Sequence, residues 1–192
     1  MTTNGKHPRV VALIGPAGAG KTSLAEAMLF ATGAIPRQGT VEAGSSVGDA
    51  SPEARSRGGS TELNIMRVDN QGGRFVIGGA PGSPGLAADA MLAVGTAALA
   101  VVVIDSDPAR ASLVEPTLRW LEAKGVPHAL FVNKIDQARG NIEELLTALE
   151  PMSAAALVAR QIPIREGERI IGFVDLALER AFHYEAGKAS HQ

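Results

Sequence analysis

The 192-residue sequence contains no cysteine, few aromatic residues and almost no net charge. Without cysteine the chain can form neither a disulfide framework nor a thiolate metal site, and a reducing, cytoplasmic location fits this composition. Aromatic residues make up only 4% of the chain, so the core must be built mainly from small side chains. The net charge of −2 provides no bulk attraction to nucleic acid, and we expect no direct sequence-specific nucleic-acid binding.

Long hydrophobic runs are also scarce. Residues 86–104 form the run that raises the question of a membrane span. Asp89 and Gly95 interrupt it, and a helix over 86–94 followed by a buried strand explains the run better. The first ten residues are polar and lack the apolar segment of a signal peptide. We therefore expect no membrane partner.

A glycine-rich loop stands out among the features that are present. Residues 15–22 read GPAGAGKT and match the phosphate-binding pattern G-x-x-x-x-G-K-[ST]. A strand is predicted before the loop (9–14) and a helix after it (22–33). Glycines let backbone N–H groups turn toward phosphate oxygens, and the helix N-terminus adds the positive end of its dipole. The predicted phosphate-binding residues are Gly15, Pro16, Ala17, Gly18, Ala19, Gly20, Lys21, Thr22 and Ser23.

Two side chains of this loop have specific chemistry. Lys21 would neutralise the β- and γ-phosphates of a nucleoside triphosphate, and we predict it as a catalytic residue. The Thr22 hydroxyl would bind Mg²⁺ as a cofactor. The simpler alternative is a flexible glycine turn that carries a solvent-exposed lysine.

The tetrapeptide NKID at 133–136 indicates which base is bound. Asp136 can accept both the N1–H and the exocyclic amine of guanine, a pair of donors that adenine does not offer. Asn133 would meet the polar edge of the base, and the stem of Lys134 would cover its ring face. Alone, NKID also fits a polar strand-to-helix turn. Together with the glycine loop it favours GTP or GDP as the ligand and disfavours a P-loop kinase or ATPase.

Strands and helices alternate along the chain. This pattern predicts an α/β, three-layer P-loop NTPase fold with a mostly parallel six-stranded sheet and helices on both faces. In such sheets the ligand lies at the carboxyl ends of the strands, where both motifs fall. The predicted strands are 9–14, 61–68, 74–78, 99–105, 127–134 and 157–164, and the predicted helices are 22–33, 86–94, 109–124 and 141–150.

With these motifs, the chain resembles the N-terminal GTP-binding domain of the elongation factor G-like family of translational GTPases, over about residues 9–185. Residues 30–60 are similar to that family's first switch region, and residues 162–184 are similar to the start of its insertion after the sixth strand. The resemblance implies GTP and GDP binding with Mg²⁺, GTP hydrolysis in protein biosynthesis, and the ribosome as partner of a longer chain.

The second switch departs from this family. Where the family has Asp-x-Pro-Gly-His, residues 79–83 read GAPGS. Gly79 replaces the aspartate that reaches Mg²⁺ through water, and Ser83 replaces the histidine that orients the attacking water. The N–H of Gly82 can still bond the γ-phosphate, and Gly82 joins Lys21 as a predicted catalytic residue. We therefore expect weak or partner-dependent GTP hydrolysis, the alternative being a nucleotide-binding switch with little or no hydrolysis.

The resemblance also suggests metal ligands. Ser60 matches the first-switch threonine that ligates Mg²⁺, so the predicted metal ligands are Thr22 and Ser60, although a shift of one residue would select Thr61. The candidates to replace the lost carboxylate, by sequence distance alone, are Asp89, Asp105 and Asp107. For Asp105, the sequence favours a helix cap within DSDPAR (105–110) over this role.

We predict a disordered N-terminus (1–8), a GTP-binding domain (9–164) and the start of an inserted subdomain or a terminal segment (165–192). The switch loops of the domain are 34–60 and 79–88. The base-capping loop that follows the sixth strand in small GTPases is not found, so we expect a fragment or truncated product. Residues 168–184 alternate as a strand would and also suit one helix face, and the resemblance implies strands.

Overall fold

The structure, a computed structural model, describes residues 7–49, 51–82, 87–138 and 141–185. The chain divides into two compact units. The first comprises Met1–Ile104 and Leu113–Asn133, and the second comprises Asp105–Ser112 and Lys134–Gln192.

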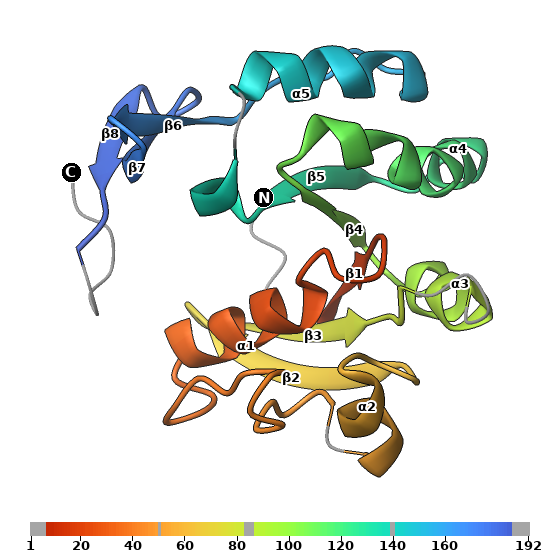
Figure 1. The fold of residues 1–192 in the computed structure, drawn as a ribbon. Coiled ribbons are helices and arrows are strands. Elements are labelled where there is room, and N and C mark those ends of the chain that lie inside the picture. Colours follow the sequence, from red (N-terminus) through yellow and green to blue (C-terminus); the bar gives the residue numbers. More distant parts are fainter. Residues whose placement is uncertain (1–6, 50, 83–86, 139–140, 186–192) are drawn as a thin grey trace. The chain divides into compact units, whose positions relative to one another are not determined.

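The first unit contains a five-stranded sheet with the strand order β2-β3-β1-β4-β5 (Figure 1). β1 pairs in parallel with both β3 and β4, whereas β2 and β3 form an antiparallel hairpin. The strands are β1 (Arg9–Ile14), β2 (Asn64–Asn70), β3 (Gly73–Gly79), β4 (Leu99–Asp105) and β5 (His128–Asn133). The α-helices are α1 (Lys21–Ala31), α2 (Pro52–Arg57), α3 (Ala87–Gly95) and α4 (Glu115–Ala123).

Helices cover both faces of this sheet. On one face, Ala25 of α1 packs with Leu13 of β1 and Ile77 of β3 in a cluster of buried side chains. Because successive residues of a strand point to opposite faces, Gly78 faces away from α1. A Cβ atom at Gly78 would lie 3.6 Å from the Cβ of Ala93 in α3, so α3 covers the other face.

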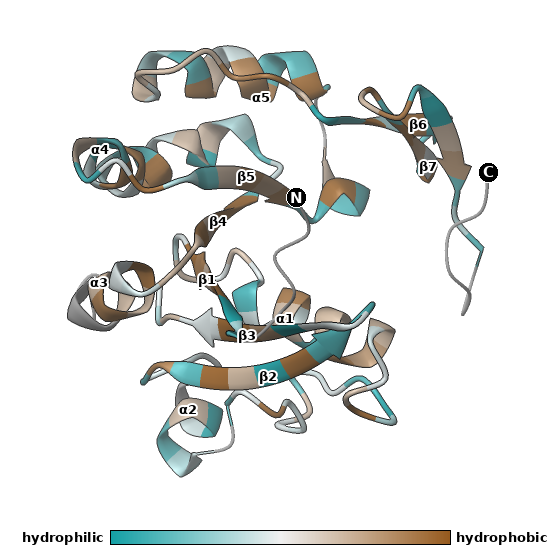
Figure 2. Cartoon of the chain, turned by 180° about the vertical axis from the view of Figure 1, so that it is seen from behind, coloured by the Kyte–Doolittle hydropathy of each residue, from teal (hydrophilic) through white to brown (hydrophobic). Residues whose placement is uncertain are grey.

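Hydropathy follows the position of each strand in the sheet. The interior strand β4 is almost uniformly apolar, whereas the edge strand β2 alternates between apolar and polar residues (Figure 2). In β2, Met66 and Val68 are buried while Ile65 and Arg67 are exposed. A strand with one buried face needs apolar residues only at every second position, which explains the alternation.

The second unit contains a separate three-stranded antiparallel sheet, β6-β7-β8. Phe173 of β7 and Phe182 of β8 stack with their ring centroids 5.1 Å apart. The guanidinium of Arg160 pairs with the Asp175 carboxylate at 3.0 Å. The strands are β6 (Gln161–Glu166), β7 (Arg169–Asp175) and β8 (Arg180–His183), the α-helix is α5 (Ile142–Leu149), and the short 3₁₀ helices are η3 (Ile135–Gln137) and η4 (Glu150–Met152).

The prediction of a six-stranded, mostly parallel sheet is therefore wrong in its sixth strand. β6 pairs with β7 across a turn that contains Gly167, whose φ is +60°, and not with the five-stranded sheet. Strand periodicity shows that a segment is extended but does not select its partner, and a neighbour reached by a short turn is the easiest one to pair. The same pairing places strands, and no helix, within residues 168–184.

Two segments differ from their predicted local structure. The helix expected over 109–124 is divided into the 3₁₀ helix η2 (Pro108–Val114) and α4, and Pro116 lies in the first turn of α4 where its missing N–H costs nothing. The loop predicted over 34–60 contains α2, which the Ser51 hydroxyl caps by accepting from the Ala54 N–H. The serine cap followed by Pro52 was the local signal for this helix.

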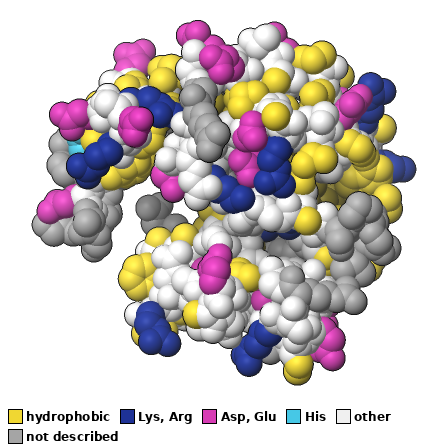
Figure 3. Space-filling model, viewed as in Figure 1, with side chains coloured by type: hydrophobic (Ala, Val, Ile, Leu, Met, Phe, Trp, Pro, Cys, Tyr) yellow, Lys and Arg dark blue, Asp and Glu magenta, His cyan; other side chains and the backbone are white. Residues whose placement is uncertain are grey.

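No helix in the described part of the chain has the length and apolar character needed to cross a membrane. On the face shown in Figure 3, the side chains of Lys and Arg are interspersed with those of Asp and Glu. This mixture is in keeping with the small net charge of the chain.

Candidate nucleotide-binding site

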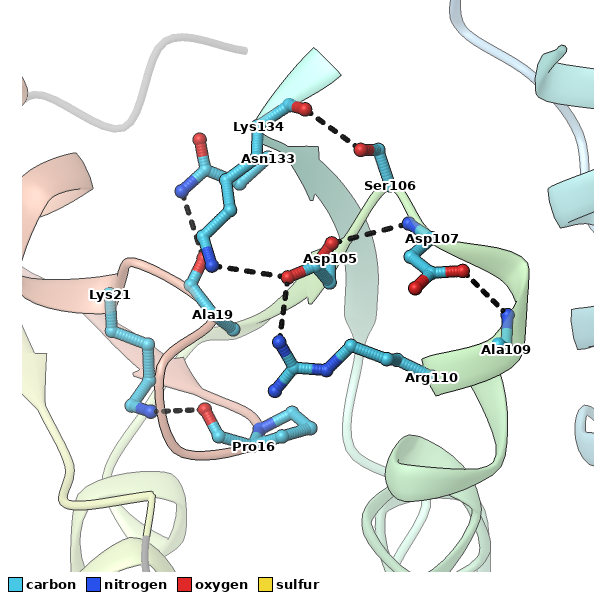
Figure 4. Close-up of polar contacts among 10 residues, drawn as sticks. All are labelled: Pro16, Ala19, Lys21, Asp105, Ser106, Asp107, Ala109, Arg110, Asn133 and Lys134. Carbon is cyan, nitrogen blue, oxygen red and sulfur yellow. Dashed lines mark hydrogen bonds and ion pairs between the residues drawn. The ribbon is translucent and has the colours of Figure 1, made fainter. Parts of the chain in front are cut away.

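The glycine loop joins the end of β1 to the start of α1, as predicted. Gly20 has a φ of +93°, and a Cβ atom there would overlap the Nδ2 of Asn133. Only glycine fits this position, because it combines left-handed backbone with a close approach. The same Asn133 amide donates to the Ala19 carbonyl at 2.8 Å (Figure 4). Two predicted site residues that lie 114 positions apart are thus in direct contact.

Lys21 lies in the curve of this loop. Its side chain is 8% exposed, and its Nζ donates to the carbonyls of Gly15 and Pro16, each at 2.9 Å. Burial lowers the pKa of Lys21 from 10.5 to about 8, and the negative charge of Asp49 opposes this shift. The buried ammonium donates these hydrogen bonds to neutral carbonyls, and a phosphate would compensate its charge better.

Gly82, from the second switch, lies directly against the loop. A Cβ atom at Gly82 would overlap the Lys21 Nζ and the backbone nitrogen of Ala17. This contact leaves no space for a side chain, so the backbone of residue 82 can approach the phosphate-binding loop only as glycine. Ser83, predicted to replace the water-orienting histidine, lies outside the described residues.

Thr22, the predicted metal ligand on α1, is surrounded by oxygen atoms. Its Oγ1 donates to the Asp49 Oδ2 at 2.9 Å and lies 3.3 Å from the Ser60 Oγ. The structure thus brings the predicted ligand Ser60 next to Thr22. Hydroxyl and carboxylate oxygens are the donors that Mg²⁺ prefers, so the chemistry of this group fits the ion that the family implies.

Sequence reasoning missed two carboxylates of the first unit. Asp49 is 3% exposed beside Thr22, although the candidates named from the sequence were Asp89, Asp105 and Asp107. Loop 34–60 has no periodicity that would reveal which residue turns inward. The resemblance to a switch region was the only signal pointing to this loop.

Glu26, the second missed carboxylate, joins α1 to the same loop. It is 1% exposed, and its carboxylate accepts hydrogen bonds from the N–H groups of Gly39, at 2.9 Å, and of Val47. The spacing of Glu26 on α1 predicted a helical residue but did not indicate that it faces the core. Through this residue, the helix that begins at the phosphate-binding lysine is tied to the predicted first switch.

In the second unit, Lys134 and Asp105 form an ion pair at 3.1 Å, and Arg110 binds the same Asp105 oxygen at 3.0 Å (Figure 4). Burial opposes ionisation of Asp105, but hydrogen bonds from Lys134 and the Asp107 N–H, with the charges of Lys134 and Arg110, outweigh it and lower the pKa of Asp105. The Ser106 hydroxyl donates to the Lys134 carbonyl at 2.8 Å. Asp105 thus holds the lysine of NKID.

The remaining aspartates named from the sequence have other positions. The Asp107 carboxylate accepts from the Ala109 N–H at 3.0 Å and so caps η2, the role that had been considered for Asp105. Asp136 is exposed on η3, directly after Lys134, whose φ of +56° forms the turn. The side chain of Asp89 lies outside the described residues.

Comparison with known proteins agrees with these features. Residues 6–177 match the family described as the elongation factor Tu GTP binding domain. An elongation factor G-like protein of Synechocystis is 36% identical over 182 residues, which are 95% of this chain and 27% of that protein. A peptide chain release factor 3 of Lactobacillus delbrueckii is 30% identical over 186 residues, 94% of this chain and 36% of that one.

A solved structure from Thermus thermophilus aligns with a TM-score of 0.86 at 29% identity, covering 96% of this chain and 28% of the other. The chain spans 27% and 36% of the length of the two curated relatives above. The matched residues include the glycine loop, both predicted switch segments and NKID. The chain belongs to the family of elongation factor Tu GTP binding domains, and it is a GTP-binding domain of the elongation factor G-like type found in translational GTPases.

Proposed function

We propose that the chain binds GTP and GDP together with Mg²⁺, with the glycine loop on the phosphates and NKID on the guanine. The observation that carries this proposal is Lys21, buried in the loop with its ammonium bonded to the carbonyls of Gly15 and Pro16. Phosphate oxygens are stronger acceptors for an ammonium than peptide carbonyls, so bound nucleotide would draw Lys21 away from them. The loop N–H groups of the predicted phosphate-binding residues would complete the contact.

Base recognition follows from the second motif. Asp136 is the acceptor for the two guanine donors, and Lys134 covers the ring while Asp105 holds its ammonium. Asn133 supports the phosphate loop through Ala19 and so joins base recognition to phosphate binding. Thr22 and Ser60 are the proposed Mg²⁺ ligands. The ion, when bound, would neutralise charge on the β- and γ-phosphates.

We propose further that the chain hydrolyses GTP slowly on its own and faster with a partner. Gly79 provides no carboxylate at the end of β3, while Gly82 remains against the loop where its N–H can meet a γ-phosphate. Groups that orient water or stabilise charge contribute about 10³–10⁵ in rate in such reactions. The ribosome is the proposed partner, acting on a longer chain in which residues 9–164 form the GTP-binding domain and residues 165–192 begin an insertion.

Competition binding tests the ligand. A fluorescent GDP analogue bound to the purified chain in Mg²⁺ should be displaced by unlabelled GTP and GDP and not by ATP. Lys21→Ala should bind at least about tenfold more weakly, because it removes a charged hydrogen-bond donor worth about 1.5–3 kcal/mol. Displacement by ATP as effective as displacement by GTP would contradict the assignment of NKID.

Single-turnover hydrolysis of γ-labelled GTP, with and without ribosomes, tests the reaction. Slow release of phosphate that ribosomes accelerate would support the proposal. No release under either condition would select the alternative, a nucleotide-binding switch without hydrolysis. Fast release by the chain alone would show that Gly79 and residue 83 have been misread.

A further inference from the structure

Gly79 stands where the family's second switch has an aspartate. Gly79 ends β3, and a Cβ atom added there would meet no atom of another residue closer than the Met66 Cε at 3.6 Å. Gly79 also lines a small pocket together with Lys21, Thr22 and Asn64. β3 therefore sends no carboxylate toward Thr22, although a Cβ atom at Gly79 would make only ordinary van der Waals contacts.

The carboxylate of Asp49 lies in this region, next to Thr22. Asp49, in the loop before α2, is 3% exposed. Its Oδ2 accepts from the Thr22 Oγ1 at 2.9 Å, and its Oδ1 accepts from the Asn64 Nδ2 at 3.1 Å. Each oxygen has a partner from a regular element, α1 or β2, so the carboxylate has a defined orientation.

We propose that Asp49 provides the anionic group of the Mg²⁺ site that Gly79 lacks. Because the Thr22 hydroxyl donates its hydrogen bond to Asp49, the lone pairs of the Thr22 oxygen remain available to a cation. A carboxylate that accepts a hydrogen bond from a metal ligand fixes the orientation of that ligand and makes it more basic. Asp49 is thus a positioning residue that acts through Thr22, and this inference rests on the nucleotide site proposed above.

Two further contacts hold Asp49 at this place. Asn64 binds it from β2, and Glu26 binds the loop at Val47, two residues before Asp49. Both anchors belong to elements that contribute to the buried cluster between α1 and the sheet. Since these contacts come from elements of the core, they fix the position of Asp49 next to Thr22.

The test measures how Mg²⁺ retains a fluorescent GDP analogue on the full chain. Its dissociation rate is followed over a titration of MgCl₂ and again in EDTA. Asp49→Asn keeps the shape of the side chain and removes its charge. We expect it to raise the Mg²⁺ concentration needed for half-maximal retention by about 10–100-fold. The rate in EDTA should equal that of the wild type, because no metal takes part there.

Glu62→Gln is the matched control, since Glu62 is an exposed carboxylate two residues after Ser60. It should leave the Mg²⁺ midpoint unchanged. Gly79→Asp in the Asp49→Asn background should restore the midpoint toward the wild-type value, because it returns a carboxylate from β3. A purely structural role of Asp49 would not be rescued in this way.

An unchanged midpoint in Asp49→Asn would overturn the inference, as would an equal acceleration in Mg²⁺ and in EDTA. If Asp49→Asn does not fold by circular dichroism, Asn64→Ala replaces it and should raise the midpoint by a smaller factor, and no change would again overturn the inference. Failure of the wild-type chain to bind the analogue at any Mg²⁺ concentration would instead contradict the proposed function itself.

Discussion

The positive charge of Lys21 lies in a buried position where it contributes little to the stability of the fold. Lys21 is 8% exposed, and its ammonium donates hydrogen bonds to two carbonyls of its own loop. Such a residue reduces the stability of the folded protein, whereas the proposed role of its charge is to bind phosphate. Functional groups held in a costly environment are a common reason for a trade-off between stability and activity.

Replacement of Lys21 by methionine tests this trade-off. Burial holds the pKa of Lys21 at about 8, against 10.5 in the unfolded chain. Between these values the unfolded state binds more protons, so this lysine makes the free energy of unfolding rise with pH from about 8 to 10.5. Lys21→Met should abolish that rise and stabilise the nucleotide-free chain at pH 7 by about 1–3 kcal/mol.

Urea unfolding of both proteins from pH 7 to 10.5 measures this effect. The difference between wild type and variant isolates Lys21 from the other groups that titrate in the same range. Equal stability of the two proteins at pH 7, with parallel pH profiles, would show that burial of the Lys21 ammonium does not destabilise the fold.

Asp136 is the residue on which we propose that the choice of base depends. Asp136 is exposed, so a ligand could reach its carboxylate. Asp136→Asn should weaken GTP binding by about 10–100-fold, since a hydrogen bond to a charged group contributes about 1.5–3 kcal/mol. Inosine triphosphate lacks the exocyclic amine of guanine, so the wild type should bind GTP more tightly than inosine triphosphate. In the variant this preference for GTP should be much smaller.

Calorimetric titration with both nucleotides measures the two preferences. Asp69→Asn, which changes an exposed aspartate on β2, is the control and should keep the wild-type ratio. A preserved preference for GTP in Asp136→Asn would place guanine recognition elsewhere.

At the level of helices and loops, hydrogen bonds to Glu26 connect α1 with the loop over 34–60. Glu26 accepts from the N–H groups of Gly39 and Val47, and these bonds lie at the two ends of an irregular segment. A loop held at both ends by a core residue can stay close to the site without regular structure of its own. This arrangement explains how a glycine- and serine-rich segment supplies Asp49.

Glu26→Ala should release this loop. Removing the carboxylate leaves two loop N–H groups without their acceptor, and we expect a loss of about 1–3 kcal/mol in the free energy of unfolding. Amide hydrogen exchange at Gly39 and Val47 should be faster than in the wild type. Glu42→Gln, an exposed change in the same loop, should alter neither quantity. Unchanged protection at both amides would contradict the proposed anchor.

At the scale of the whole chain, nucleotide binding and stability are linked. A ligand that binds only the folded state stabilises it by about 2.7 kcal/mol at a concentration one hundred times its Kd. Mg²⁺ with GDP should therefore raise the midpoint of thermal unfolding of the wild type by several degrees, and Lys21→Met should lose this shift. A shift of equal size with Mg²⁺ and ATP would argue against guanine selectivity.

The sequence alone determined the local features of this protein. A pattern of eight residues predicted the strand, loop and helix around Lys21, because that motif depends on backbone freedom at fixed glycines. The alternation of apolar residues placed most strands and helices, and the resemblance to elongation factor G-like domains was confirmed by the comparisons. These features depend on neighbours in sequence, so they can be read without the fold.

Contacts between residues that are far apart in the sequence became known from the tertiary structure. It paired β6 with β7 and not with the larger sheet, brought Asn133 to Ala19, and placed Asp49 beside Thr22. Loop 34–60 has no periodicity, so the inward turn of Asp49 follows from its anchors on α1 and β2 and not from its own residues. Contacts of this kind arise from packing between elements, which local sequence patterns do not encode.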